Sequence, residues 1–212
     1  MLTVLLIRHA ACDHVGRLVA GRAPGIRLNQ QGREQARALA EALARAPAGA
    51  ADLVERPRIV YASPLERATE TAEILGRGLG VPVDRLEALT ELDFGAWTGR
   101  TLESLEGDPI WRAFNEARGT TRIPGGELMA DAVERAMTGL RRLEREHPGP
   151  TVAAVSHGDV IRGVLLHCLG MPLDHIHRLE VAPASVSVVR LFEWGARVAT
   201  VNWRPVGPLA PD

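Results

Sequence analysis

The sequence predicts an α/β fold in which helices cover both faces of a central sheet. Two short uncharged runs, at 2–7 and 151–156, are mainly apolar and are typical of strands buried on both faces. Each run leads into a histidine, His9 in the first case and His157 in the second. Because α/β sheets bind ligands beyond the carboxyl ends of their strands, we expect both histidines to face one ligand site.

The composition is that of an ordinary globular chain and excludes several classes of protein. The 212 residues carry a formal net charge of -1, so no overall field attracts nucleic acid or a membrane surface. No apolar run is long enough to span a bilayer, and no basic segment precedes Leu2 as a secretory signal requires. Cys12 and Cys168 lie far apart and form no metal or redox spacing, so we expect a reduced, cytoplasmic setting.

The basic residues are all of one kind. The sequence contains no lysine, so its 25 basic residues are arginines. This excludes P-loop, Schiff-base and pyridoxal phosphate chemistry, each of which needs a lysine. Arginine offers instead a planar fork that binds phosphate or carboxylate through two hydrogen bonds.

Strand and helix patterns alternate along the first half of the chain. A polar, glycine-rich loop over 10–28 precedes a predicted helix at 30–46, which has one apolar face. A capping box formed by Ser63 and Glu66 predicts a second helix, which ends near Gly78. The remaining elements expected here are short strands at 58–62 and 81–84.

The second half begins with an irregular stretch that contains two glycines and two aromatic residues, at 91–99. No linker or repeat divides the chain, so we expect one domain over 1–212. Within it we expect a substrate-specificity insert at about 93–126 and a flexible tail at 205–212. The predicted elements are helices within 101–119, at 128–146 and at 160–169, and strands at 185–191 and 197–201.

Arg8, His9, Arg67 and His157 together predict a site for a phosphoryl group. Arg67 falls in the first turn of a predicted helix, where free backbone N–H groups already favour an anion. A neutral imidazole is a nucleophile toward phosphorus, and flanking arginines lower its pKa and offset charge in the transition state. Glu91 is a candidate general acid, because neighbouring aromatic side chains raise the pKa of a carboxyl. This chemistry requires no metal and no cofactor.

Four motifs in this order make the chain resemble the histidine phosphatase superfamily, the phosphoglycerate mutase-like group. The resemblance extends from about 2 to 191 and implies a three-layer α/β/α sandwich with a mostly parallel mixed sheet. It implies His9 as the phosphorylated nucleophile, Glu91 as proton donor and acceptor, and Arg8, Arg67 and His157 as the phosphate pocket. The motifs are Ile7-Arg8-His9, Ser63-Pro64-Leu65 followed by Arg67, Ala68, Thr71 and Ala72, the stretch from Glu91 to Gly99, and Ser156-His157-Gly158.

The loop that follows His9 departs from the family pattern. Ala10, Ala11 and Cys12 stand where the family usually has Gly, Glu and Thr. An asparagine expected in the same loop is missing, and we expect His14 to take over its phosphate contact. The full predicted substrate-binding set is Arg8, Arg67, His157, His14, Gly21, Arg22 and Gly158.

The resemblance predicts a metal-independent phosphomonoesterase. Its substrate is expected to be a small phosphorylated metabolite, and its product inorganic phosphate. The stretch from 92 to 97 is closer to the phosphatase branch than to the mutases. Phosphoglycerate mutase-type phosphoryl transfer stays open as an alternative, since Arg100, Arg112 and Arg118 are available for a substrate carboxylate.

Two further alternatives stay open at this stage. The chain can be a non-catalytic phosphate-binding protein on the same fold. It can also be a serine esterase, because Ala154, Ser156 and Gly158 resemble a nucleophile elbow between a strand and a helix. The two late strands leave a sheet edge at which a homodimer can form.

Overall fold

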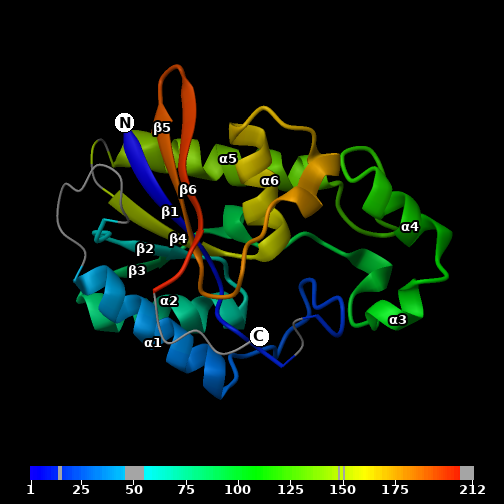
Figure 1. The fold of residues 1–212 in the computed structure, drawn as a ribbon, viewed down its shortest axis with the longest axis horizontal. Helices are drawn as coiled ribbons and strands as arrows, with labels where there is room; N and C mark the ends of the chain where they lie inside the picture. Colours follow the sequence, from blue (N-terminus) through cyan, green and yellow to red (C-terminus); the bar gives the residue numbers. More distant parts are fainter. Residues whose placement is uncertain (14–15, 46–54, 148, 150, 206–212) are drawn as a thin grey trace.

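A six-stranded mixed sheet forms the centre of the protein, in the order β3-β2-β4-β1-β5-β6 (Figure 1). The computed structural model describes residues 1–13, 16–45, 55–147, 149 and 151–205. Neighbours from β3 to β1 are parallel, while β5 and β6 are antiparallel to their neighbours. The strands are β1 Leu2–Arg8, β2 Val60–Ala62, β3 Val83–Arg85, β4 Thr151–Ser156, β5 Val186–Phe192 and β6 Gly195–Trp203.

Two pairs of helices sandwich this sheet, so the predicted three-layer α/β/α architecture is confirmed (Figure 1). Alternate side chains of β1 enter two separate cores, as expected for a strand buried on both faces. Leu2, Val4 and Leu6 pack with α5 and α6, whereas Leu5 and Ile7 pack with α1 and α2. The helices are α1 Gln30–Ala44, α2 Glu66–Leu79, α3 Leu102–Leu105, α4 Pro109–Glu116, α5 Met129–Glu146 and α6 Gly158–Cys168.

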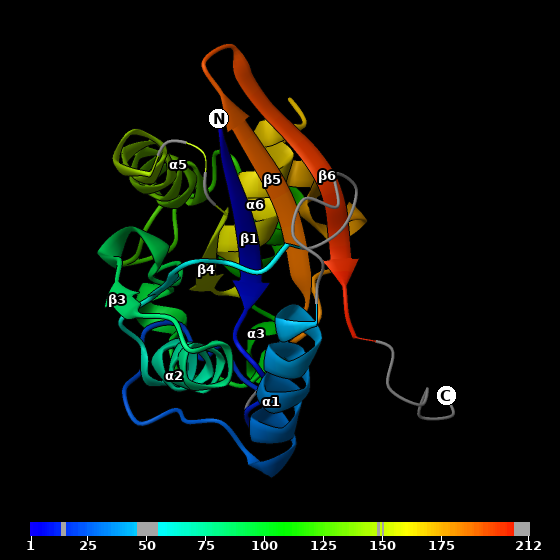
Figure 2. The same cartoon turned by 90° about the vertical axis from the view of Figure 1, so that its left-hand side faces the viewer.

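The order of the strands explains why the first motif and the last one meet. Figure 2 shows β1 flanked by β4 on one side and β5 on the other, with β6 at the sheet edge. In the parallel pair of β1 and β4, Arg8 lies opposite Ser156, so both strands end at the same level. The residues that follow them therefore leave the sheet side by side.

The start of α2 differs from the sequence prediction. The helix begins at Glu66 with Leu65 as its N-cap, not at Ser63. The Ser63 hydroxyl lies 2.7 Å from Nε2 of His157. The carboxylate of Glu66 accepts a hydrogen bond from the N–H of Gly25, 2.8 Å away. Long-range partners have thus replaced the local capping box.

The segment at 93–126 builds a small core of its own beside the sheet, where α3 and α4 lie (Figure 1). Trp97 and Phe114 are fully buried, and Trp111 packs against them while half-buried. Their rings lie edge-on or tilted, with the centroids of Trp97 and Phe114 5.4 Å apart. These aromatic side chains therefore fill a core. Among the described residues, no helix combines the length and apolar composition needed to cross a membrane.

Candidate active site

The ends of β1 and β4 bring His9 and His157 together. Their ring centroids are 5.2 Å apart, and the side chains are 4% and 0% exposed. The backbone N–H of His9 donates to the carbonyl of Ser156, 2.9 Å away, which continues the pairing of the two strands by one residue. The two imidazoles therefore lie side by side at the edge of the sheet where the strand ends place them.

The hydrogen bonds of His9 identify the ring nitrogen that carries the lone pair. Nδ1 donates to the carbonyl of Ala10 at 2.8 Å, so Nε2 carries the lone pair. This Nε2 accepts a hydrogen bond from Nε of Arg67 at 3.3 Å. Burial and the charge of Arg67 lower the pKa of His9 to about 3, with a smaller contribution from Arg8. The imidazole is therefore neutral at physiological pH, as a nucleophile must be.

Buried N–H groups without a partner surround His9. Arg67, in the first turn of α2, is 1% exposed and donates through Nη2 to the carbonyl of Gly21 at 2.8 Å. Arg8 donates through Nη1 to the carbonyl of Val181 at 2.7 Å. Nε of Arg8, Nη1 of Arg67 and Nδ1 of His157 have no hydrogen-bond partner among the described residues. Unpaired buried donors are rare, and three of them beside a nucleophile suit the oxygens of a phosphoryl group.

Ser63 sets the orientation of the second imidazole. Its hydroxyl contacts Nε2 of His157 at 2.7 Å, and burial together with the charge of Arg67 lowers the pKa of His157 well below its ordinary value. Because the Ser63 hydroxyl already accepts from the N–H of Leu65 at 3.4 Å, its own proton can be donated to Nε2 of His157. With this assignment the neutral ring carries its proton on Nδ1 and supplies a donor to the site. The sequence pattern suggested a helix cap for Ser63 and did not reveal this role.

Glu91 completes the cluster after the short 3-10 turn that ends β3. Its side chain is 12% exposed, with Oε2 3.9 Å from Nδ1 of His157. Burial and the negative charge of Asp159 raise the pKa of Glu91 to about 7, against the opposing charge of Arg67. The expected increase in pKa is present, but burial and Asp159 cause it rather than the aromatic neighbours. The aromatic residues that follow Glu91 face the small core instead.

The sequence analysis did not single out Asp159, although it directly follows the fourth motif. Burial on its own would raise its pKa, but the guanidinium groups of Arg118 and Arg162 hold the pKa below its ordinary value. Arg118 contacts Oδ2 of Asp159 at 2.9 Å, and Arg162 contacts Oδ1 at 3.2 Å. The carboxylate therefore stays charged close to Glu91.

The other predicted binding residues divide into two groups. The carbonyl of Gly21 holds Arg67, and a Cβ at Gly158 would lie 3.3 Å from Nε of Arg8, so glycine leaves room for this guanidinium. The guanidinium of Arg22 instead binds the backbone carbonyl of Glu91 and the carboxylates of Asp93 and Glu127, and its predicted phosphate contact stays a prediction. His14 lies outside the described residues.

The altered loop after His9 is held through its backbone. The N–H of Ala10 donates to Oγ1 of Thr71 at 3.1 Å, and the N–H of Ala11 donates to Oε1 of Gln35 at 3.0 Å. Cys12 is a buried free thiol. Since α1 and α2 fix this segment by its N–H groups, the loop keeps its place without the usual family side chains.

The serine esterase alternative is wrong. Ser156 is fully buried, and its hydroxyl donates to the carbonyl of Leu89 at 2.7 Å. A nucleophile elbow needs a serine that is exposed above the sheet. Ser156 instead anchors the turn that carries Glu91.

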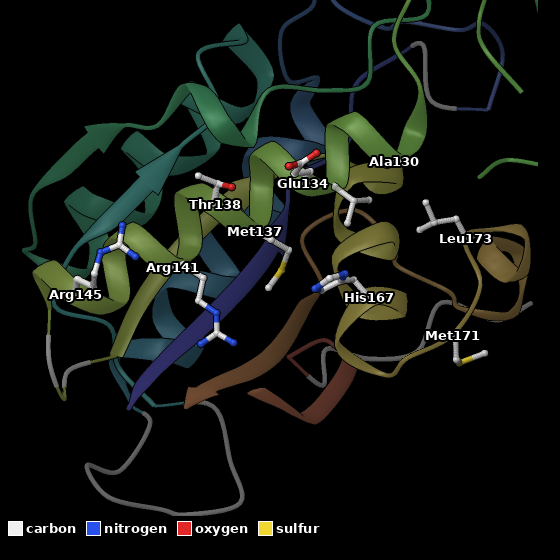
Figure 3. Close-up of a pocket in the computed structure, with 10 residues that line it drawn as sticks. Ala130, Glu134, Met137, Thr138, Arg141, Arg145, His167, Met171 and Leu173 are labelled. Carbon is white, nitrogen blue, oxygen red and sulfur yellow. The ribbon is translucent and has the colours of Figure 1, made fainter. Parts of the chain in front are cut away.

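A groove between α5 and α6 lies apart from this cluster. Figure 3 shows Met137, Arg141 and His167 along it, and its volume is about 510 Å³. The side chains of the cluster around His9 do not line this groove; they belong to Arg8, His9, Arg67, Glu91 and His157. Arg141, which does line it, is bound to Glu144 and to the carbonyl of Phe192. Among the described residues, no three His, Cys, Asp or Glu side chains are placed to hold a metal ion.

The mixed sheet between two helical layers is the phosphoglycerate mutase-like α/β fold. The profile of the histidine phosphatase superfamily (branch 1) matches residues 4–204, and the chain belongs to this superfamily. The structure of YhfR from Bacillus stearothermophilus superposes with a TM-score of 0.83, at 28% identity, over 94% of this chain and 96% of that one.

The matches to two proteins of similar sequence cover different shares of those proteins. Phosphoserine phosphatase 1 of Hydrogenobacter thermophilus is 29% identical over 197 residues, which cover 91% of this chain and 88% of that protein. A bifunctional protein of Mycobacterium tuberculosis is 36% identical over 197 residues, which cover 91% of this chain and 51% of that protein. The chain thus spans about half the length of the mycobacterial relative.

Proposed function

We propose that this chain is a metal-independent phosphomonoesterase that acts through a phosphohistidine on His9. The observation that carries the proposal is the neutral imidazole of His9 close to three buried nitrogens, on Arg8, Arg67 and His157, that have no hydrogen-bond partner among the described residues. A nucleophile without charge, surrounded by fixed positive dipoles and charges, suits attack on a phosphate dianion.

In the first step, Nε2 of His9 forms a bond to phosphorus while the bond to the ester oxygen breaks. Arg8, Arg67 and His157 hold the non-bridging oxygens, and their charge and N–H groups stabilise the transition state. Protonated Glu91 gives its proton to the departing alkoxide. The products of this step are the free alcohol, a phosphorylated His9 and an ionised Glu91.

In the second step, water replaces His9 on phosphorus. Carboxylate Glu91 accepts a proton from the water as its oxygen attacks, and the P–N bond breaks. Inorganic phosphate leaves, while His9 becomes neutral again and Glu91 is protonated. The cycle needs one acid–base group with a pKa near neutrality, which is the property that burial and Asp159 give to Glu91.

The proposed substrate is a small phosphorylated metabolite, in agreement with the name of the Hydrogenobacter relative. We propose a single domain over 1–212 whose segment 93–126 selects the substrate. Arg118 supports this role, since it joins the segment to Asp159 at the start of α6. A cytoplasmic location and a homodimer stay predictions, as does the flexible tail.

Phosphoryl trapping tests the proposal. The protein is incubated with a labelled phosphodonor and denatured in alkali, in which phosphohistidine is stable. We expect label on His9 and steady release of inorganic phosphate, and neither in His9→Ala. Absence of label and of phosphate release from a broad panel of phosphate esters would support the non-catalytic alternative.

Product analysis distinguishes the proposed phosphomonoesterase from the mutase alternative. The protein is given 3-phosphoglycerate and a bisphosphoglycerate primer, and both isomerisation and phosphate release are followed. We expect phosphate release to be faster, because a mutase must keep water away from the phosphohistidine. Faster isomerisation would favour phosphoglycerate mutase-type transfer instead.

A further inference from the structure

The main-chain carbonyl of Glu91 accepts hydrogen bonds from two arginines that lie far from it in the sequence. Nε of Arg22, in the loop after β1, donates to the carbonyl of Glu91 at 2.8 Å. Nη2 of Arg135, on α5, donates to the same carbonyl at 3.1 Å. Both arginines thus act on the peptide that carries the proposed general acid, and neither supplies one of the unpaired donors around His9.

A single carboxylate holds these two arginines in place. Oε2 of Glu127 accepts from Nη2 of Arg22 at 2.9 Å and from Nη2 of Arg135 at 3.1 Å. Oε1 of Glu127 accepts from Nε of Arg135 at 2.9 Å. The Glu127 side chain is 17% exposed, so the pairing is largely shielded from solvent. Burial would raise the pKa of Glu127, but the bonds and charge of Arg135 keep the pKa below its ordinary value.

Glu127 also binds the segment that follows Glu91. The N–H of Asp93 donates to Oε2 of Glu127 at 3.2 Å, and the N–H of Glu127 donates to the carbonyl of Asp93 at 3.0 Å. A Cβ at Gly126 would lie 2.4 Å from that carbonyl, so only glycine permits the approach. Residues 91–93 are therefore fixed from the Gly126-Glu127 turn by both backbone and side chain.

The carboxyl of Glu91 depends on this backbone for its position. Its one hydrogen bond within the described residues comes from the adjacent N–H of Leu92, to Oε1 at 2.9 Å. A general acid must lie within about 2.6–3.2 Å of the oxygen that it protonates. Movement of the main chain would carry the carboxyl out of this range, since the contact of its Oε2 with Nδ1 of His157, at 3.9 Å, is too long for a hydrogen bond that would restrain it.

We propose that Glu127 is a positioning residue for Glu91, which it acts on through Arg22 and Arg135; this inference rests on the proposed function. Glu127 binds no substrate in this scheme. It fixes the peptide from which the proton-donating carboxyl projects. Loss of the Glu127 charge is expected to release both arginines and to loosen that peptide.

The expected signature is a dependence on the leaving group. The alkoxide that leaves an alkyl phosphate is strongly basic and needs the proton of Glu91. The 4-nitrophenolate that leaves p-nitrophenyl phosphate is weakly basic and needs it much less. A misplaced acid therefore slows the departure of the alcohol, which kcat/KM reports, only for the first substrate, whereas a general loss of folded protein slows both equally.

The test compares Glu127→Gln with Glu144→Gln, assayed with ethyl phosphate and p-nitrophenyl phosphate. Glu144 is a matched control because it pairs with Arg141 at 2.7 Å on α5 and is 15% exposed. For Glu127→Gln we expect about a tenfold lower kcat/KM with ethyl phosphate, and less than about a twofold change in kcat/KM with p-nitrophenyl phosphate. kcat/KM is compared because it reports the step in which the alcohol leaves, whereas hydrolysis of the phosphohistidine is common to both substrates. The control is expected to match the unmodified protein.

Equal losses on both substrates, or the same selective loss in the control, would overturn the positioning role. If Glu127→Gln fails to fold, Arg135→Lys provides a second variant, since lysine keeps the charge but not the fork. The same selective loss is expected from it, and its absence would also overturn the role. Phosphate release by the unmodified protein is measured first; its absence from both substrates would refute the proposed function itself.

Discussion

Replacement of Glu91 by Gln is expected to change how both activity and stability depend on pH. The pKa of the Glu91 carboxyl is raised from its ordinary value of 4.5 to about 7. Above that value the protonated fraction falls about tenfold for each pH unit. We therefore expect kcat/KM of the unmodified protein to fall about tenfold per unit on the basic side of about pH 7. Glu91→Gln is expected to have low, flat activity over the same range.

The raised pKa of Glu91 also predicts the direction and the size of the change in unfolding free energy with pH. A raised pKa means that the folded state binds the proton more tightly than the unfolded state. The contribution of Glu91 is therefore full below pH 4.5 and is lost as the pH rises through about 7. At about 1.4 kcal/mol per pKa unit, the loss is on the order of 3 kcal/mol. Glutamine does not titrate and avoids this loss.

Denaturant unfolding across this pH range is the assay. Relative to the unmodified protein, Glu91→Gln is expected to gain on the order of 3 kcal/mol between about pH 4.5 and pH 8. Phosphate is left out, so that ligand binding does not alter the folded state. A constant difference in unfolding free energy across the range would show that Glu91 titrates normally, and the assignment as general acid would fail.

Two further predictions concern the surroundings of this carboxyl. Asp159→Asn removes the negative charge that helps to raise the pKa of Glu91. The pH at which kcat/KM begins to fall on the basic side is therefore expected to decrease by up to about one unit. An unchanged pH profile would contradict this role of Asp159. Phe114→Ala empties the fully buried centre of the small core at 93–126, which is expected to cost about 3–5 kcal/mol in denaturant unfolding, and a loss below about 1 kcal/mol would show that this core does not stabilise the fold.

Much of the fold was predictable because its strongest signals are local. The uncharged runs at 2–7 and 151–156 are strands buried on both faces, and the amphipathic stretches between them are helices that cover the sheet. Parallel strands that both end in histidine place those histidines at one edge, whatever the intervening chain does. This rule placed His9 and His157 at one edge of the sheet, and their contact also required β4 to lie beside β1.

The sequence does not predict the partners of side chains that have a choice. Ser63 and Glu66 have the spacing of a capping box, yet they bind His157 and Gly25. Arg22 lies in a loop that the family pattern associates with phosphate, yet it binds the main chain of Glu91. In each case a partner far away in the sequence competes with a local one, and the spacing of residues cannot rank them.

Periodicity and short motifs thus suffice for the layers, the strand ends and the identity of the residues in the site. They cannot supply the pKa of about 7 at Glu91 or the pKa of about 3 at His9, because both depend on burial and on charges that the fold brings close. They also cannot reveal that Arg22 and Arg135 bind the carbonyl of Glu91. These contacts join residues 69 and 44 positions apart, and such pairs are chosen by packing in three dimensions rather than by neighbours along the chain.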